Sequence, residues 1–340
     1  MRVLIVRLRA IGDVIHGVPV ACAVKDHMPN AFVAWLAEDW AGEVLEGHPA
    51  IDQLIIVRPG WSRSATQILH LRRQLRALRF DVVLDLQGVR NSVLAAVLSG
   101  AQRRIGFVGM VSHQARRIVP NEDWQRGFSR RIGRALRFEL VQASKEHIVD
   151  RYLETLAPLG VDAPRVRFGF PESDVEDFGI NGSFAVINPG GPEWKMWPAD
   201  RFASVARHLG ASHALPTVVV QGHREEERDA ARRIVEASGD WARLLVPISL
   251  RQLGALAGKS QVFLSGDTGP LHLAAAFGAP CVGLIGHDMA DRFRPYGAGN
   301  IVLRGTPVRI DQARYRGLGA DAMKAIRVED VCQACDQMLL

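Results

Sequence analysis

Short apolar runs recur along the whole chain, and stretches with helical spacing of apolar residues separate them. In the first half the runs occupy residues 3–8, 32–37, 53–57, 82–86 and 104–107. In the second half they occupy residues 184–190, 217–222, 244–248, 262–267, 281–286 and 300–305. Nearly continuous apolar strands of this length are typical of parallel sheets that helices cover on both faces. The alternation predicts an α/β protein with doubly wound parallel sheets.

The pattern runs twice, and a segment rich in proline, glycine and acidic residues separates the halves near 170–180. We therefore predict two Rossmann-like domains, residues 1–175 and 176–322, with a cleft between them. A helical pattern over 323–340 predicts a C-terminal helix that packs back toward the first domain. Ligands of open α/β sheets bind at the carboxyl ends of the strands, so functional side chains are expected there.

Nothing in the composition indicates secretion or membrane insertion. No apolar run approaches the ~20 residues that a membrane-spanning helix requires. The basic N-terminus lacks the apolar length of a signal peptide, so we expect a cytoplasmic protein. Cys332 and Cys335 form a lone C-x-x-C pair in a helical pattern. We interpret them as buried or half-buried helical thiols, with a redox pair or half of a zinc site as the alternatives.

Positive charge is concentrated in the first half of the chain. Residues 1–170 contain 24 Lys and Arg against 16 Asp and Glu, a net charge of +8. Residues 171–340 contain 18 against 20, a net charge of −2. Two arginine-rich helical patterns lie in the basic half, at 62–80 and 126–140. They suit an anionic partner, such as nucleic acid, a membrane surface or an acidic substrate, unless they are only solvated faces. Aromatic residues are sparse in them, which argues against stacking on bases.

The turn after the strand at 262–267 has the features of an anion site. Asp267 and Thr268 can cap a helix that begins near Pro270, and its first N–H groups would then face a diphosphate. The expected donors are the N–H groups of Thr268, Gly269 and Leu271. His272 lies one turn into the same helix and could add another donor. The alternative is an ordinary helix cap with a buried histidine.

The turn after the strand at 184–190 has a similar character. It contains the loop Gly190-Gly191 and, shortly after, Lys195, whose compact positive charge suits a phosphate. Trp194 and Trp197 flank the lysine and could wall the site. The alternative is a solvated loop lysine beside two packing tryptophans.

The first strand–helix turn carries one acidic residue. In RLRAIGDVIHG, residues 7–17, Asp13 follows a glycine at the expected start of a helix. An acid in that place can simply stabilise the helix dipole. At the end of a strand it could also accept a proton from a bound hydroxyl group. His16, three residues on, lies on the same helix face and could orient a ligand.

Several other enzyme classes lack their motifs. GALAGKS, residues 254–260, has three residues between its glycines where a P-loop needs four, and a strand follows it rather than precedes it. The first strand is not followed by G-x-G-x-x-G, and neither H-E-x-x-H nor G-x-S-x-G occurs. These absences argue against an ATPase, a nicotinamide dehydrogenase, a metalloprotease and a serine hydrolase.

Taken in order, these motifs resemble the bacterial ADP-heptose:lipopolysaccharide heptosyltransferases of glycosyltransferase family 9. The resemblance is carried by residues 1–20, 82–107, 146–160, 187–206 and 265–286. G-D-V-x-H near the N-terminus together with D-T-G-x-x-H late in the chain is specific as a set. The resemblance implies a GT-B fold and an inverting glycosyltransferase that needs no cofactor or bound metal. Its N-terminal half would bind the acceptor and its C-terminal half the nucleotide-sugar.

The resemblance also implies roles for individual residues. Asp13 would be the catalytic base, and Lys195 would bind the donor phosphates and stabilise the leaving group. The other expected donor-binding residues are Gly190, Gly191, Asp267, Thr268, Gly269 and His272. A family glutamate that contacts the ribose has no clear counterpart, and His223 or Glu225 could replace it. The basic half suggests acceptor-binding residues, namely His16, Arg63, Arg126, Arg130 and Arg131.

We therefore expect a heptosyltransferase that uses ADP-heptose and an anionic lipid A-core acceptor of the Kdo-lipid A type. It would be cytoplasmic, peripheral at the inner leaflet of the membrane, and without a nucleic-acid partner. Three alternatives stay open: a family member with another nucleotide-sugar, a GT-B nucleotide-sugar epimerase, and a basic module that binds membranes or nucleic acid without catalysis.

Overall fold

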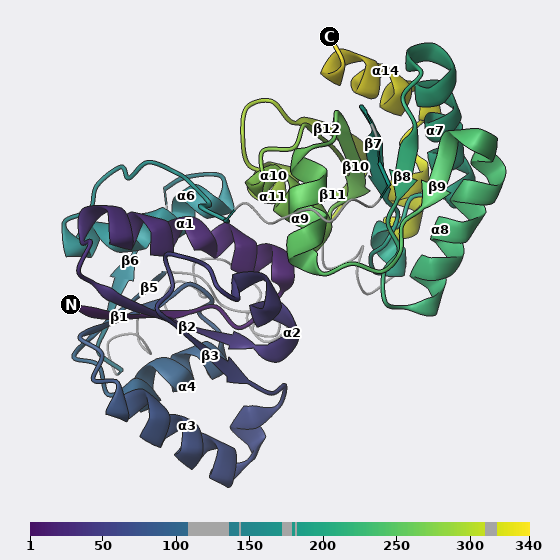
Figure 1. Ribbon diagram of the computed structural model, residues 1–340. Coiled ribbons are helices and arrows are strands. Elements are labelled where there is room, and N and C mark those ends of the chain that lie inside the picture. Colours follow the sequence, from purple (N-terminus) through teal and green to yellow (C-terminus); the bar gives the residue numbers. More distant parts are fainter. Residues whose placement is uncertain (108–135, 143, 172–178, 181, 310–317) are drawn as a thin grey trace. The chain divides into compact units, whose positions relative to one another are not determined.

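The structure is a computed structural model that describes residues 1–107, 136–142, 144–171, 179–180, 182–309 and 318–340 (Figure 1). The chain divides into two compact units, Met1–Pro171 (unit 1) and Glu172–Leu340 (unit 2). The predicted domain boundary at residue 175 falls within 172–178, outside the described residues.

Unit 1 contains one six-stranded sheet in which all neighbouring strands are parallel. Its strands are β1 (Arg2–Val6), β2 (Phe32–Glu38), β3 (Gln53–Val57), β4 (Val82–Asp85), β5 (Arg103–Phe107) and β6 (Phe138–Val141). Their order in the sheet is β3-β2-β1-β4-β5-β6. The chain therefore reverses its winding between β1 and β4, where ligands bind in doubly wound sheets.

Helices cover both faces of this sheet, as the apolar strands require (Figure 1). The described helical elements of unit 1 are α1 (Ile11–His27), α2 (Asp39–Gly42), η1 (Glu43–Leu45), η2 (Trp61–Arg63), α3 (Ala65–Ala77), α4 (Arg90–Ser99), α6 (Ile148–Leu153) and η4 (Glu154–Leu159). α3 and α4 close one face, where Leu71 and Leu75 pack with Leu4 and Leu36 in the core. α1 and α6 contact each other on the other face.

Unit 2 repeats the plan. Its strands, all parallel to their neighbours, are β7 (Ala185–Asn188), β8 (Thr217–Val219), β9 (Ala242–Leu244), β10 (Val262–Gly266), β11 (Cys281–His287) and β12 (Ile301–Val308). Their order in the sheet is β12-β11-β10-β7-β8-β9. Read from β9 to β12, with β7 counted as the first strand, this is the same order as in unit 1. The corresponding switch point lies between β7 and β10.

Two apolar clusters cover the two faces of the second sheet. The described helical elements are η5 (Glu193–Lys195), α7 (Ala199–His213), α8 (Glu225–Ser238), η6 (Gly239–Trp241), α9 (Leu250–Gly258), α10 (Gly269–Ala276), α11 (Ala290–Phe293), α13 (Leu318–Lys324) and α14 (Val328–Met338). α7, α8 and α14 contribute to one cluster, and α9 and α10 to the other.

The predicted α/β class with two parallel sheets is confirmed, and two local predictions were wrong. Residues 138–140, expected at the end of an arginine-rich helix, belong to strand β6. This strand is only partly buried, so its apolar pattern is weak and the helical spacing before it dominated the prediction. The apolar run 244–248 was predicted to be a strand, but β9 covers Ala242–Leu244 and shares only Leu244 with that run. β9 is a short strand at the edge of the sheet.

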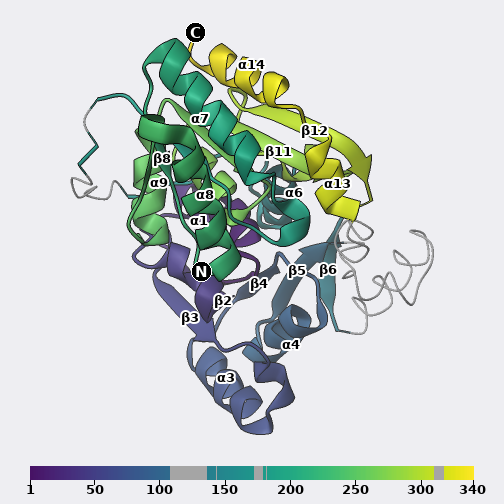
Figure 2. The ribbon, with the colours of Figure 1, turned by 90° about the vertical axis from the view of Figure 1, so that its right-hand side faces the viewer.

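The C-terminal segment forms two helices, α13 and α14, and α14 lies alongside α7 (Figure 2). Val331, Ala334 and Cys335 anchor α14 in the apolar core of unit 2. All four cysteines are free, and Cys332 and Cys335 are half-buried and buried thiols, as predicted. Burial, with the nearby carboxylate of Asp336, raises the pKa of Cys332 to about 11.

Among the described residues, no helix has both the length and the apolar composition that crossing a bilayer demands.

Candidate active site

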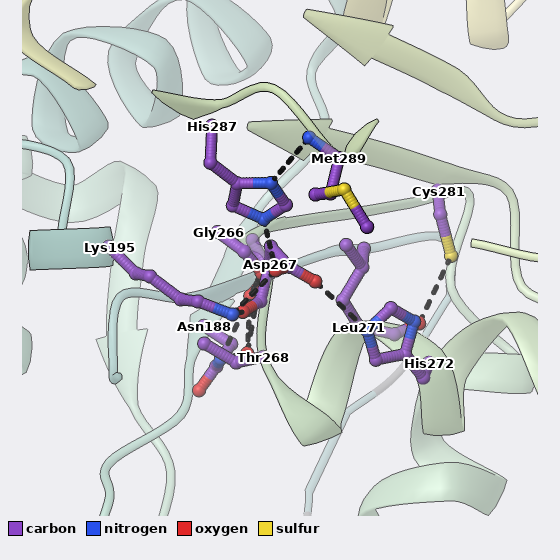
Figure 3. A network of polar contacts seen from close by, with 11 residues as sticks. Asn188, Lys195, Gly266, Asp267, Thr268, Leu271, His272, Cys281, His287 and Met289 are labelled. Atoms are coloured by element: carbon purple, nitrogen blue, oxygen red, sulfur yellow. Dashed lines mark hydrogen bonds and ion pairs between the residues drawn. The ribbon is translucent and has the colours of Figure 1, made fainter. Parts of the chain in front are cut away.

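The turns that follow β7 and β10 meet at the switch point of unit 2 (Figure 3). Asn188, the last residue of β7, joins them. Its side-chain amide donates to Ser265 Oγ at 2.9 Å and to Thr268 Oγ1 at 3.2 Å. Asn188 and Ser265 are paired at the carboxyl ends of β7 and β10, and Thr268 follows β10 as the N-cap residue of α10, so the pairing of these strands brings the three side chains together.

Glycines let the two turns approach each other closely. Gly191 has φ +147°, and a Cβ atom there would lie 2.8 Å from Thr268 Cγ2. A Cβ atom on Gly266 would lie 2.7 Å from the carbonyl oxygen of Lys195. Any other residue would clash at these two positions, so they are occupied by glycine for a steric reason.

Lys195 and Asp267 form a largely buried ion pair at the meeting point (Figure 3). The Lys195 ammonium donates to Asp267 Oδ2 at 2.5 Å and to the Asp267 carbonyl oxygen at 2.7 Å. The two side chains are 19% and 6% exposed. A lysine has three N–H donors, and among the described residues two of them find acceptors, so one remains for a ligand.

Two histidines complete the surroundings of Asp267. His272 Nε2 lies 3.0 Å from Oδ1, and His287 Nε2 lies 2.8 Å from Oδ2. The backbone N–H of Met289 donates to His287 Nδ1, so the proton of this imidazole resides on Nε2 and faces the carboxylate. Burial by itself would raise the pKa of Asp267, but Lys195 and the two histidines hold it well below its usual value. Asp267 is therefore a buried carboxylate.

The N-terminus of α10 lies directly beside this carboxylate. Thr268 is the N-cap residue and Pro270 lies in the first turn. Within the part of the chain that the structure describes, the N–H groups of Thr268 and Gly269 have no hydrogen-bond acceptor. The N–H of Leu271, expected to face a ligand, instead donates to the Thr268 carbonyl oxygen at 3.1 Å. Two N–H donors and the positive end of the helix therefore remain for an anion.

The glycine loop is held from the other side by the start of α8. Glu227 accepts a hydrogen bond from the Gly191 N–H at 3.0 Å, and Arg224 bonds both Glu227 and the Gly191 carbonyl oxygen. His223 and Glu225, the two expected ribose contacts, are exposed and do not participate in these bonds. Glu227 is thus the acidic residue of this segment that reaches the glycine loop.

Asp13 lies at the switch point of unit 1, in the first turn of α1. Its Oδ2 accepts from the N–H of Ala10 at 3.3 Å and pairs with the guanidinium of Arg7. Burial alone would lower the pKa of Arg7, but the charge of Asp13 and its hydrogen bond, together with Tyr152 and Asp85, outweigh burial and raise that pKa, so the cation persists. Among the described residues no donor reaches Asp13 Oδ1, and the side chain is 27% exposed. One carboxylate oxygen is held and the other is available.

The neighbouring strand end supports the same turn. Gln87, just after β4, accepts from the N–H of Leu8 at 2.8 Å. Asp85, at the end of β4, is buried and accepts from the N–H groups of Gln87 and Gly88 at 3.0 and 2.9 Å. Burial raises the pKa of Asp85 against the opposing effect of these bonds. Asp85 shapes the loop and is not open to solvent.

The remaining predicted residues fall into three groups. His16 is buried, with its ring edge-on to His147 at 5.7 Å. Arg63 is exposed at the end of η2. Arg126, Arg130 and Arg131 lie outside the described residues.

Of the two tryptophans that were expected to wall the site, only one lies there. Trp197 is buried in the core, where its indole N–H bonds the Ile326 carbonyl oxygen. Trp194 stays at the site, with its ring 4.9 Å from the Lys195 ammonium.

Sequence reasoning missed Arg7, Asn188, Glu227 and His287. Three of them share a signal: Asn188 and His287 are the last residues of buried strands, and Arg7 follows one. A polar residue in that place is expected to face a ligand site in a parallel sheet. Glu227 carries no such signal, because it lies in an acid-rich helix start where every glutamate suits the dipole.

Comparison with known proteins shows the family of this chain. The sequence model of glycosyltransferase family 9 (heptosyltransferase) matches residues 68–313, which include the Lys195 and Asp267 turns. The chain belongs to this family. It is therefore an enzyme, a glycosyltransferase of family 9.

Relatives and solved structures extend over nearly the whole chain. Lipopolysaccharide heptosyltransferase 3 of Escherichia coli is 23% identical, over 98% of this chain and 97% of its own length. Lipopolysaccharide heptosyltransferase 1 of Pseudomonas aeruginosa is 27% identical, over 84% and 79%. The structure of E. coli heptosyltransferase WaaC with ADP has a TM-score of 0.78 at 21% identity, covering 99% and 100% of the two chains. The likeness confirms the GT-B fold class for this family 9 member.

Replacing Asp267 by asparagine is expected to destabilise the protein by about 3 kcal/mol, because Lys195 would lose its buried partner. The folded pKa of Asp267 lies below the unfolded value of about 3.9, so the carboxylate stabilises the fold above that pH. The difference from the wild type should be constant near neutral pH and should shrink as the pH falls below about 4. Urea unfolding across pH measures it.

Asp291→Asn provides the matched control, since Asp291 pairs with Arg304 on the surface. An exposed pair of this kind contributes less than about 1 kcal/mol. Equal losses of unfolding free energy in both variants would show that the Asp267 network stabilises the protein no more than an exposed ion pair does.

Proposed function

We propose that this protein transfers heptose from ADP-heptose to a hydroxyl group of the lipopolysaccharide inner core, with inversion and without a catalytic metal. Unit 2 binds the donor and unit 1 supplies the base. The observation that carries the proposal is the Lys195–Asp267 pair at the N-terminus of α10, in a chain of glycosyltransferase family 9. The relatives named above as lipopolysaccharide heptosyltransferases support the sugar and the acceptor class.

The donor diphosphate is proposed to bind at the β7/β10 switch point. The N–H groups of Thr268 and Gly269 and the third N–H of Lys195 are the donors that would contact it. Asp267 holds the ammonium beside the start of α10 through two hydrogen bonds, and the third N–H would then bind the diphosphate. Glu227 occupies the Gly191 N–H, so the glycine loop contributes its small size rather than that hydrogen bond.

Asp13 is proposed to be the base. Its Oδ1 would take the proton from the acceptor hydroxyl as that oxygen attacks C1 of the sugar, while Arg7 and the Ala10 N–H hold Oδ2. The bond from C1 to the diphosphate oxygen breaks at the same time, on the opposite side of C1, which inverts the anomeric centre. Lys195 and the α10 N-terminus would stabilise the negative charge on the departing ADP. In other enzymes a bound metal ion stabilises this negative charge.

Family membership favours transfer over epimerisation and over a non-catalytic basic module. The donor nucleotide is the finer question. Saturable stabilisation by ADP and not by UDP would support ADP-heptose, whereas equal or reversed stabilisation would favour another nucleotide-sugar. This measurement uses the intact chain and needs no acceptor.

The acceptor side is proposed to use the basic surface of unit 1. α3 exposes Arg72, Arg73 and Arg76 to solvent, and Leu69 beside them is 55% exposed. A helix that combines exposed arginines with an exposed leucine suits the anionic surface on which a lipid-linked acceptor lies. We therefore propose peripheral binding at the inner leaflet.

Asp13→Asn is expected to lower turnover by about 10²–10⁴-fold, because the amide keeps the size of the side chain but is a far weaker base. ADP affinity should stay close to that of the wild type. Initial rates with ADP-heptose and a Kdo-lipid A acceptor, with calorimetry for ADP, measure both quantities. Asp26→Asn, at the other end of α1, is the control and should keep full turnover. Wild-type turnover in Asp13→Asn would remove Asp13 from the base role.

Lys195→Ala is expected to weaken ADP binding by about 1.5–3 kcal/mol, the usual contribution of a charge-assisted hydrogen bond. Lys195→Arg should restore it poorly, because a planar guanidinium cannot reproduce the same contacts. Calorimetry with ADP tests this, and exposed Lys259→Ala in the same unit is the control. Unaltered ADP affinity in Lys195→Ala would place the diphosphate elsewhere.

The double variant Arg72→Gln/Arg73→Gln is expected to bind vesicles containing phosphatidylglycerol more weakly, by about 1 kcal/mol per charge. Co-sedimentation at two salt concentrations measures this, since salt screens the attraction. Arg232→Gln/Arg233→Gln removes two adjacent exposed arginines from unit 2 and should have little effect. If the two double variants lose affinity equally, α3 is not the membrane-binding surface.

A further inference from the structure

Unit 2 contains a second cluster of polar side chains, which shares no residue with the candidate active site. His208 and His213 belong to α7, and Asp336 belongs to α14. The Nε2 atom of each histidine lies 2.7 Å from the same oxygen, Oδ1 of Asp336. In the described part of the chain, it is the one group of three or more such side chains placed closely enough to hold a metal ion.

Local helix geometry does not explain why the two histidines converge. Residues five apart on a helix point about 140° away from each other. His213 is, however, the last residue of α7, and Ala214 after it has a positive φ of 49°. The two rings lie 5.9 Å apart with an interplanar angle of 72°, and both turn their Nε2 atoms toward α14. The cluster therefore depends on the packing of α14 against α7.

The cluster is open to solvent and negatively charged at its centre. The side chains of His208, His213 and Asp336 are 29%, 32% and 40% exposed. Burial would raise the pKa of Asp336, but the contacts with the two histidines outweigh it and lower that pKa. A cation in solution can therefore reach a carboxylate that two imidazoles already face.

The three ligand atoms are those that zinc prefers. Zn²⁺ takes imidazole nitrogen and carboxylate oxygen at about 2.0–2.2 Å, in tetrahedral geometry, and open sites keep water as the fourth ligand. Ligands of one tetrahedral zinc lie roughly 3.3 Å apart, which follows from those bond lengths. The present N–O separations of 2.7 Å would thus need to open by only about 0.6 Å. Side-chain rotation at an exposed site can supply a change of that size.

We propose that His208, His213 and Asp336 form a Zn²⁺ site that joins the C-terminal helix α14 to α7. Each imidazole binds through Nε2, with its proton on Nδ1, Asp336 binds through its carboxylate, and water completes the coordination. The site is structural: it adds a metal bridge to the apolar contacts of Val331, Ala334 and Cys335. It is independent of the proposed transferase mechanism and takes no part in it.

Cys332 is the competing zinc ligand that a test must separate. It lies one helical turn before Asp336 on α14 and is half-buried. It does not belong to the group of described side chains whose ligand atoms all lie within 4.8 Å of one another, so it is not placed to share the ion. Its replacement by serine should leave zinc binding intact.

The experiment titrates the full-length protein with Zn²⁺ after a chelator has been used and removed. A chromophoric indicator reports the affinity, and thermal unfolding reports the change in Tm. Binding with Co²⁺ gives the visible absorption of a four-coordinate ion. The variants are His213→Gln and Asp336→Asn, with His208→Gln as a further variant should either fail to fold. The controls are Cys332→Ser and His70→Gln, which removes an exposed histidine of unit 1.

We expect the wild type to bind one Zn²⁺ with micromolar or tighter affinity and to gain Tm as zinc saturates it. His213→Gln and Asp336→Asn should lose about tenfold or more in affinity, together with the zinc-dependent gain in Tm. Both controls should behave as the wild type does. Binding only at millimolar zinc, wild-type affinity in both ligand variants, or loss of binding in Cys332→Ser would each overturn the proposal.

Discussion

The buried ion pair between Lys195 and Asp267 is the interaction on which the switch point of unit 2 depends. A carboxylate in that place would be costly alone, because burial disfavours its charge. One ammonium and two imidazoles surround it, and together they keep it ionised. In return, the carboxylate fixes the direction of the lysine and ties the turn after β7 to the turn after β10. The free N–H groups at the start of α10 then lie beside an ammonium whose position is set before any ligand arrives.

The repeated strand order explains why this pair and Asp13 occupy equivalent places. Both sheets reverse their winding between the first and fourth strands of the unit, at β1/β4 and at β7/β10. At such a point the two loops turn to opposite faces of the sheet and leave room for a ligand. Unit 1 places Arg7 and Asp13 there, and unit 2 places Lys195 and Asp267 there. Each pair joins a cation to a carboxylate, but unit 1 leaves a carboxylate oxygen available and unit 2 leaves an ammonium N–H.

The two units also differ in net charge. Unit 1 carries the basic excess, with exposed arginines on α3, whereas unit 2 has a small acidic excess. A surface that meets an anionic, lipid-linked substrate benefits from long-range attraction. The proposed diphosphate site in unit 2 would not need it, because two N–H groups, a helix dipole and one lysine would provide local contacts. The cluster of His208, His213 and Asp336 lies outside both of these sites, where α14 packs against α7.

Sequence alone determined the fold class, the position of most strands and which polar residues follow the main strands. Apolar runs and helical spacing are local properties, so β1 and β7 could be located without tertiary information, as could Asp13 and Asp267 after their strands. The weak pattern of edge strand β6 did not suffice, because partial burial removes the apolar signal.

What tertiary structure decided was which side chains meet. Lys195 and Asp267 are far apart in the chain, and only the pairing of β7 with β10 brings them into contact. His287 joins them because β11 pairs with β10, and Glu227 reaches the glycine loop because it lies in the first turn of α8. The three-residue cluster at α14 likewise exists only when two helices pack. Contacts of this kind depend on strand order and helix packing, and no local pattern in the amino-acid sequence encodes them.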